Sequence, residues 1–226
     1  MQKKIVSLVL CLVCVFSVVV CAQAEDSDYL AQISGTYVEL FPELSKEEYR
    51  PLWLEATGAL VGEENAEEAT DMLLSMCMAE IYGDEAAAQY AEDPDSMRFD
   101  CYFLGGVSRF VMDGNTITGL DADGNEVFSH TYEYQDVENE NGFIFYKTED
   151  EDAGQFTWFA FSPDTMEETY HLEFRYAEDQ EDLMSWFEGN YAYWNAAGIA
   201  VDYSEETMAN CINLFATENL SEEEAA

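Results

Sequence analysis

Short alternating segments separated by tight-turn dipeptides constrain the middle of this chain most strongly. Between residues 97 and 177, the pairs Asp113-Gly114 and Asp123-Gly124 and the polar stretch 138–141 separate runs rich in aromatic and β-branched residues. Asp-Gly between two such runs is a β-hairpin signal. The strands recur about every ten residues, which is typical of an antiparallel meander that closes as a barrel or folds as a sandwich.

The expected fold is therefore mostly β with added helices. We expect strands at residues 33–40, 99–104, 107–112, 116–120, 126–134, 142–147, 155–161 and 169–177. Apolar residues at helical spacing predict helices over 51–60 and 65–82, within a helical insertion at about 45–90. Ser45 and Glu48 form a capping-box pattern, while Asp179 and Ser204 are N-cap candidates for two later helices.

The first 24 residues have the three parts of a secretory signal peptide. Lys3 and Lys4 are followed by the uncharged apolar run 5–20 and by Ala22-Gln23-Ala24, a small-x-small cleavage pattern. We expect cleavage near Ala24, a single domain over 25–220, and an acidic disordered tail at 221–226. The alternative is a lipoprotein anchored through Cys21. No other segment is long and apolar enough to span a membrane.

Acidic residues dominate the charge. The formal net charge is -40, and removal of Lys3 and Lys4 would take it to -42 because residues 1–24 contain no acidic side chain. Such a surface repels the phosphates of nucleic acids and anionic lipids, so neither is an expected partner. It also attracts cations weakly over its whole area, so weak metal binding alone would say little.

Three cysteines follow the leader, at Cys77, Cys101 and Cys211. No CxxC occurs and the spacing is too wide for a zinc ribbon. An exported protein can form a disulfide, and Cys77–Cys101 is the first pair to consider. We expect instead that Cys77 and Cys211, both on apolar helix faces, are buried structural thiols, and the disulfide stays the alternative.

The familiar catalytic motifs are absent from this sequence. GxSxG, GxxxxGKS, HExxH and GxGxxG do not occur, and only two histidines are present. The run 121–126 contains closely spaced acidic residues, but its glycine is fourth rather than sixth, so a hairpin turn is expected there instead of an EF-hand loop. We therefore expect a protein that is not an enzyme, although an unrecognised acidic catalytic pair stays an alternative.

One strand carries two metal-ligand side chains. In the segment 169–177, Tyr170, Leu172, Phe174 and Tyr176 share one face and Thr169, His171, Glu173 and Arg175 the other. Asp164 lies at the end of the preceding strand, and an antiparallel return could place it beside His171 and Glu173. One imidazole and two carboxylates suit a divalent ion such as zinc. The alternative is an ordinary polar face in which Glu173 pairs with Arg175.

The order of these parts resembles the ZinT (YodA-like) family of extracytoplasmic zinc-binding proteins. The likeness is carried by Gly35-Thr36-Tyr37, the hairpin at 107–119, the strand with His171, and the run 186–194 that leads to the Ser204-Glu205-Glu206 helix. The resemblance implies a calycin-type, lipocalin-like antiparallel β-barrel. It also implies export, and binding of zinc or a similar ion that is shared with a metal-uptake transporter component.

The resemblance assigns the site residues one by one. His171 matches the first histidine of the family's His-x-His, Glu173 occupies the position of the second, and Asp164 lies nearest to an earlier histidine. Carboxylates in place of two imidazoles move the site toward harder ions than zinc. The alternative is a lipocalin-like binding module that has lost the metal and holds an apolar ligand or a protein partner among its many aromatic side chains.

Overall fold

The computed structural model describes residues 29–77, 101–140, 142–162, 169–185 and 194–221. The strands are β1 (Gly35–Glu39), β2 (Arg109–Asp113), β3 (Thr116–Leu120), β4 (Glu126–Thr131), β5 (Glu133–Gln135), β6 (Ile144–Lys147), β7 (Trp158–Phe161), β8 (Leu172–Ala177) and β9 (Ala196–Ala200). The α-helices are α2 (Tyr29–Gln32), α3 (Leu40–Leu44), α4 (Arg50–Val61), α5 (Ala66–Cys77), α7 (Gln180–Met184) and α8 (Glu205–Leu220), with single 3₁₀ turns at Glu47–Tyr49 and Gly154–Phe156.

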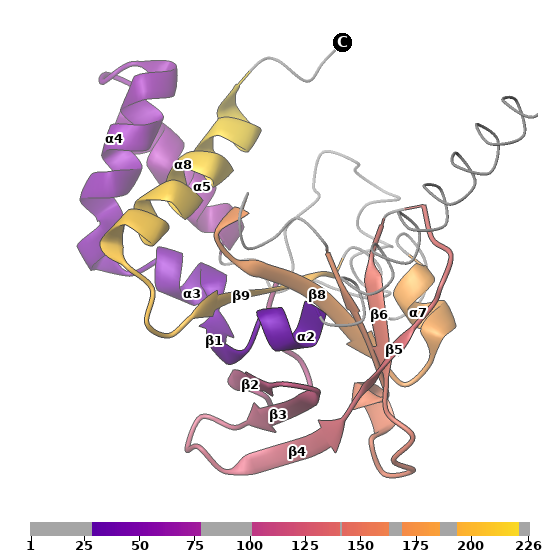
Figure 1. Ribbon diagram of the computed structural model, residues 1–226. Coiled ribbons are helices and arrows are strands. Elements are labelled where there is room, and N and C mark those ends of the chain that lie inside the picture. Colours follow the sequence, from indigo (N-terminus) through magenta and orange to yellow (C-terminus); the bar gives the residue numbers. More distant parts are fainter. Residues whose placement is uncertain (1–28, 78–100, 141, 163–168, 186–193, 222–226) are drawn as a thin grey trace, which may run out of the picture.

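The nine strands form one sheet in the order β4-β3-β2-β1-β9-β8-β7-β6-β5. Every pairing is antiparallel. The two edge strands, β4 and β5, are consecutive in the chain and separated only by Tyr132. The two edges of the sheet are therefore joined through one residue, so the sheet curls into a nearly closed barrel (Figure 1). The expected mostly β architecture, an antiparallel barrel with added helices, is confirmed.

The hairpin turns form where the sequence places them. Gly114 connects β2 to β3 with a φ of 57°, a left-handed conformation that glycine adopts at little cost. In the next turn the Asp121 carboxylate accepts hydrogen bonds from the backbone N–H groups of Asp123 and Asn125. The run 121–126 is thus a turn followed by the start of β4, as expected.

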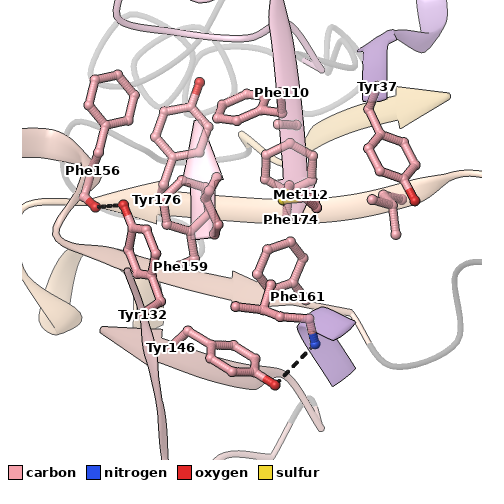
Figure 2. Packing of buried hydrophobic residues seen from close by; sticks show 14 of the residues in the cluster. Tyr37, Phe110, Met112, Tyr132, Tyr146, Phe156, Phe159, Phe161, Phe174 and Tyr176 are labelled. Atoms are coloured by element: carbon pink, nitrogen blue, oxygen red, sulfur yellow. Dashed lines mark hydrogen bonds between the residues drawn. The ribbon is translucent and has the colours of Figure 1, made fainter. Parts of the chain in front are cut away.

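Aromatic rings fill the barrel interior. Phe110 is fully buried, and its ring centroid lies 4.8 Å from that of Phe103 and 5.1 Å from that of Phe174 (Figure 2). Tyr132 donates its hydroxyl hydrogen to the carbonyl oxygen of Phe156, which satisfies this buried polar group. An apolar ligand of the kind that the lipocalin-like alternative requires would therefore have to displace these described side chains.

Four helices cover the outer face of β1 and β9. Helices α3, α4, α5 and α8 bury a second apolar cluster against Ala197 and Ile199, and they group at the upper left of Figure 1. Trp53 of α4 is its largest fully buried side chain, and its Nε1–H donates to the carbonyl oxygen of Leu44 at 2.9 Å. The outer face of the barrel thus has a core of its own, separate from the interior.

Two local expectations were wrong, one strand was missed, and the alternative disulfide is absent. Ser45 does not begin a helix: it follows α3, and its hydroxyl donates to the carbonyl oxygen of Phe41, so it serves the end of a helix. Residues 101–104 are not a strand, and β9, built from Ala-Ala-Gly-Ile-Ala, was not foreseen. Cys77, Cys101 and Cys211 form no disulfide with one another, so the Cys77–Cys101 pair is not formed.

The remaining helix expectations hold where the structure describes them. The helices expected at 51–60 and 65–82 are found as α4 and α5. Asp179 and Ser204 cap α7 and α8, because each side chain accepts a hydrogen bond from a backbone N–H of the first turn. In the described ranges, no helix combines the length and apolar character needed to cross a membrane. The segment expected to be a signal peptide, Cys21, and residues 222–226 of the expected tail at 221–226 lie outside the described residues.

Candidate metal site

His171, which immediately precedes β8, and Glu173 within β8 face the helical layer. Leu172, Phe174 and Tyr176 belong to the cluster in the barrel interior, so the residues that alternate with them face outward. The Nε2 atom of His171 lies 3.2 Å from Oε1 of Glu173. The His171 side chain is 10% exposed and that of Glu173 is 37% exposed. The expectation that these two side chains share a face and meet is confirmed.

A left-handed residue shapes the start of β8. Tyr170 has a φ of 66° and is the only described residue other than glycine with a positive φ. The carbonyl oxygen of Thr169, on the other side of Tyr170, lies 2.7 Å from Nδ1 of His171. Since a carbonyl oxygen can only accept, Nδ1 carries the hydrogen. The turn therefore fixes the imidazole ring with Nδ1 occupied and Nε2 directed at Glu173. Strained residues of this kind concentrate at functional sites.

Asn195 holds the other oxygen of Glu173. It immediately precedes β9, and its Nδ2 donates to Oε2 of Glu173 at 3.0 Å. Glu173 is thus bound on both sides, by an imidazole and by an amide, and its orientation does not depend on solvent. No pattern in the sequence indicates this contact, because Asn195 is 22 positions away in the chain and precedes a strand that was not predicted.

Cys211 of α8 closes the site from the helical layer. Its sulfur lies 3.7 Å from the carbonyl oxygen of Thr169, the same oxygen that binds His171 Nδ1. Cys211 is buried, as the sequence predicted for a thiol on an apolar helix face. The site therefore lies between the outer face of β8 and helix α8, outside the aromatic interior.

Burial and contacts act in opposite directions on the two titratable groups. Burial lowers the pKa of His171, but hydrogen bonds to the Cys211 sulfur and the Glu173 carboxylate, with the charge of Glu173, outweigh it and raise the pKa to about 9 from 6.5. Burial raises the pKa of Glu173, but the hydrogen bond and charge of His171 and the Asn195 amide together lower it. At neutral pH the pair is an imidazolium and a carboxylate.

These pKa shifts make the free energy of unfolding depend on pH. The raised pKa of His171 gives stability that is fully present below pH 6.5 and is lost as the pH rises through about 9. The lowered pKa of Glu173 gives stability that is present above pH 4.5 and is lost as the pH falls through its folded value. We expect the stability difference between wild type and His171→Gln, measured by urea unfolding, to shrink between pH 6.5 and 9. An unchanged difference over that range would contradict the assignment.

Arg175 does not oppose a cation at this site. Its guanidinium donates to the carbonyl oxygens of Leu183 and Ser185, at 2.9 and 3.1 Å, at the end of α7. Burial lowers the pKa of Arg175 to about 10, against the opposing charge of Asp182. The structure therefore does not show the expected alternative, a pair between Glu173 and Arg175, and Arg175 instead anchors α7.

The third expected ligand, Asp164, lies outside the described residues. Its neighbour Ser162 ends the described part of that segment, and the Ser162 N–H donates to the carbonyl oxygen of Glu173 at 2.9 Å. Within the described ranges, no group of three or more His, Cys, Asp or Glu side chains is arranged to hold a metal ion. His171 and Glu173 thus form two sides of a site, and a third protein ligand would have to come from another segment.

The second histidine of the chain is in a different setting. His130 lies on β4, with Nδ1 2.9 Å from Oδ2 of Asp150 and its ring stacked near Phe128. Its side chain is 9% exposed, close to the value for His171. This imidazole–carboxylate pair belongs to a distant part of the barrel, so it offers a matched comparison for His171.

Comparisons with known proteins give structural likenesses alone. No protein-family model matches the sequence, and no curated protein matches it. Zn(II)-bound AdcA from Streptococcus pneumoniae is similar at 16% identity and a TM-score of 0.46, over 80% of this chain and 34% of that one. The Zn(II)-bound ZinT-like domain of the same protein is similar at 16% identity and a TM-score of 0.45, over 83% of this chain and 87% of the domain. The chain spans about a third of the length of whole AdcA. Because both TM-scores are below 0.5, the fold described above rests on the strand order and register of this chain.

Proposed function

We propose that this chain is an exported, non-enzymatic protein that binds zinc or a similar divalent cation through His171 and Glu173, with Asp164 as third ligand. Such a protein would capture the metal outside the cytoplasm and deliver it to an uptake system. Cleavage near Ala24, or lipid attachment at Cys21, would set its location. The single observation that carries the proposal is the orientation of His171, whose Nδ1 is occupied by Thr169 and whose Nε2 points at Glu173.

That orientation is the one that protein metal sites use. A histidine that binds a metal donates its other ring N–H to a carbonyl or carboxylate, which fixes the tautomer and the ring plane. Zinc binds imidazole nitrogen and carboxylate oxygen at about 2.0–2.2 Å, so tetrahedral ligands lie about 3.4 Å apart. The observed 3.2 Å between Nε2 and Oε1 is close to that separation. An ion would replace the proton that now lies between the two side chains.

The third ligand is proposed from the path of the chain. Ser162 pairs with the backbone of Glu173, and Asp164 follows two residues later. A carboxylate from this segment would join an imidazole and a second carboxylate around the ion, with water in the remaining position. Two oxygen donors and one nitrogen donor accept zinc but also harder divalent ions. When bound, the ion would be cargo, and the chain would supply only its ligands.

The test is calorimetric titration of the mature protein with zinc. Moderate salt and excess calcium would occupy the diffuse acidic surface, so only a specific site would remain visible. We expect one site in the wild type that is lost in His171→Ala, because an imidazole ligand has no replacement in that variant.

His130→Ala is the matched control, because His130 is the other imidazole in this chain that is largely buried and paired with a carboxylate. That variant should bind zinc as the wild type does. Only weak, salt-sensitive binding in the wild type, or equal loss in both variants, would refute the proposed site.

A further inference from the structure

Asn195 carries a buried oxygen that the fold leaves unused. Its Oδ1 is inaccessible to solvent and has no hydrogen-bond partner in the described part of the chain. Its Nδ2, in contrast, donates to Glu173. Buried amide oxygens nearly always accept a hydrogen bond, so one that does not requires an explanation such as a bound water or ion.

Rotating the amide by half a turn does not remove this feature. The exchange would place the amide oxygen against Oε2 of Glu173, so that two acceptors would face each other where a hydrogen bond now exists. The carboxylate therefore fixes which end of the amide is the donor, and the unused atom is the oxygen.

The register of the sheet holds Asn195 beside the candidate ligands. Glu173 of β8 pairs with Ala197 of β9, and Asn195 is two residues before Ala197, so its side chain shares the face of Glu173. The preceding residue, Trp194, is fully buried and donates from Nε1 to the carbonyl oxygen of Tyr102 at 2.9 Å. This anchor fixes the backbone at Asn195, so the amide oxygen has a set position.

We propose, building on the proposed function, that Asn195 belongs to the cation site. Its Nδ2 positions Glu173, and its Oδ1 accepts a hydrogen bond from a water molecule that the ion carries. Water fits better than direct ligation because an amide oxygen is a weaker zinc ligand than imidazole or carboxylate, whereas water on a divalent ion is a strong donor. The ion would keep one exchangeable position, which suits a cargo that must be released.

The experiment compares Asn195→Ala with Asn219→Ala in the zinc titration described above. Asn219 lies on α8 and also donates one hydrogen bond from Nδ2, to the carbonyl oxygen of Phe215 at 2.8 Å, so it matches Asn195 in chemistry but not in place. We expect Asn195→Ala to keep one site and to bind zinc about 10–100-fold more weakly. Asn219→Ala should keep the wild-type affinity.

Thermal unfolding without metal separates a site role from a structural one. If Asn195 only stabilises the fold, Asn195→Ala will lower the melting temperature of the metal-free protein and leave the zinc affinity unchanged, which would overturn the inference.

Failure of this inference can be distinguished from failure of the proposed function. If the wild type has no site that depends on His171, the proposed function fails as well. If that site exists and Asn195→Ala binds zinc normally, only the role of Asn195 fails.

A second measurement uses only the wild-type protein and so does not depend on whether a variant folds. In the ¹⁵N-labelled wild type, the side-chain amide signals of Asn195 should shift as zinc is added and stop shifting at one equivalent, because Nδ2 binds Glu173 and Oδ1 would bind the water on the ion. Signals that stay in place at one equivalent would overturn the inference.

Discussion

Phe110→Ala should lower the free energy of unfolding by about 3–5 kcal/mol, because truncation of a fully buried phenylalanine removes its transfer energy and leaves a cavity. Besides Phe103 and Phe174, the Phe110 ring contacts Tyr176 at a centroid distance of 5.5 Å and Phe159 at 6.0 Å. Each well-oriented aromatic pair contributes about 0.5–1.5 kcal/mol beyond its buried area. Because these partners come from β7, β8 and the segment 101–104, the loss should place Phe110→Ala near the upper end of the range.

The free energy of unfolding is measured by urea titration of the wild type and the variant. The slope of that free energy against urea concentration should be the same in both proteins, which shows that their denatured states are comparable. Val127→Ala is the control, since Val127 is an apolar strand residue that is 40% exposed and its truncation should change stability by no more than about 0.5 kcal/mol. A loss below about 1.5 kcal/mol for Phe110→Ala would mean that the interior is loosely packed, contrary to the ring contacts.

Trp53→Ala, in the helical layer, should also lower the free energy of unfolding by about 3–5 kcal/mol. Trp53 packs edge-on against Phe215 of α8, with centroids 6.0 Å apart and rings at 86°. The truncation also removes the donor to Leu44 at the end of α3, and an abandoned buried acceptor costs about 1–3 kcal/mol. Because α8 carries Cys211 over His171, the variant should loosen the cover of the candidate site.

The variant Trp53→Phe separates the contribution of packing from the contribution of the hydrogen bond to Leu44. It keeps a ring in the cluster and removes only the Nε1–H and part of the volume, so it should cost clearly less than Trp53→Ala. Calorimetric melting of the three proteins would measure the losses. Equal costs for the two variants would show that the hydrogen bond to Leu44, rather than packing, holds α4 against α3 and α8.

Strands β2 and β3 could be predicted because buried and more exposed side chains alternate along them. Segment 116–120 was expected as a strand and is β3, with alternating burial along its length. Strands β6, β7 and β8 are mostly buried, but their aromatic side chains indicated strands, whereas the sequence Ala-Ala-Gly-Ile-Ala of β9 offered neither alternation nor aromatic residues. Gly198 shows the reason, since a Cβ there would lie 3.3 Å from the Phe103 ring and 3.4 Å from Cβ of Tyr37. In β9, small residues leave room for the neighbouring side chains.

The candidate site was predictable only where it is local. His171 and Glu173 are two residues apart, at the start of β8 and within it, so the period expected for a β-strand was enough to place them together. Asn195 and Cys211 reach the same place through β9 and α8, and no pattern in the sequence announces contacts between segments that distant. Asp164 stays a prediction, because its segment lies outside the described residues.

The position of β9 in the sheet has a consequence for biosynthesis. It lies between β1 and β8, so without it the sheet falls into two four-stranded halves that are connected only through Tyr132. Each half can form from nearby hairpins, but β1 and β8 then present unpaired edges, which invite pairing with other chains. At about 5–20 residues per second, the ribosome needs about one to five seconds to extend the chain from the end of β8 to the end of β9. During that interval the growing chain is most exposed to aggregation, and a chaperone that covers the edges of β1 and β8 would protect it.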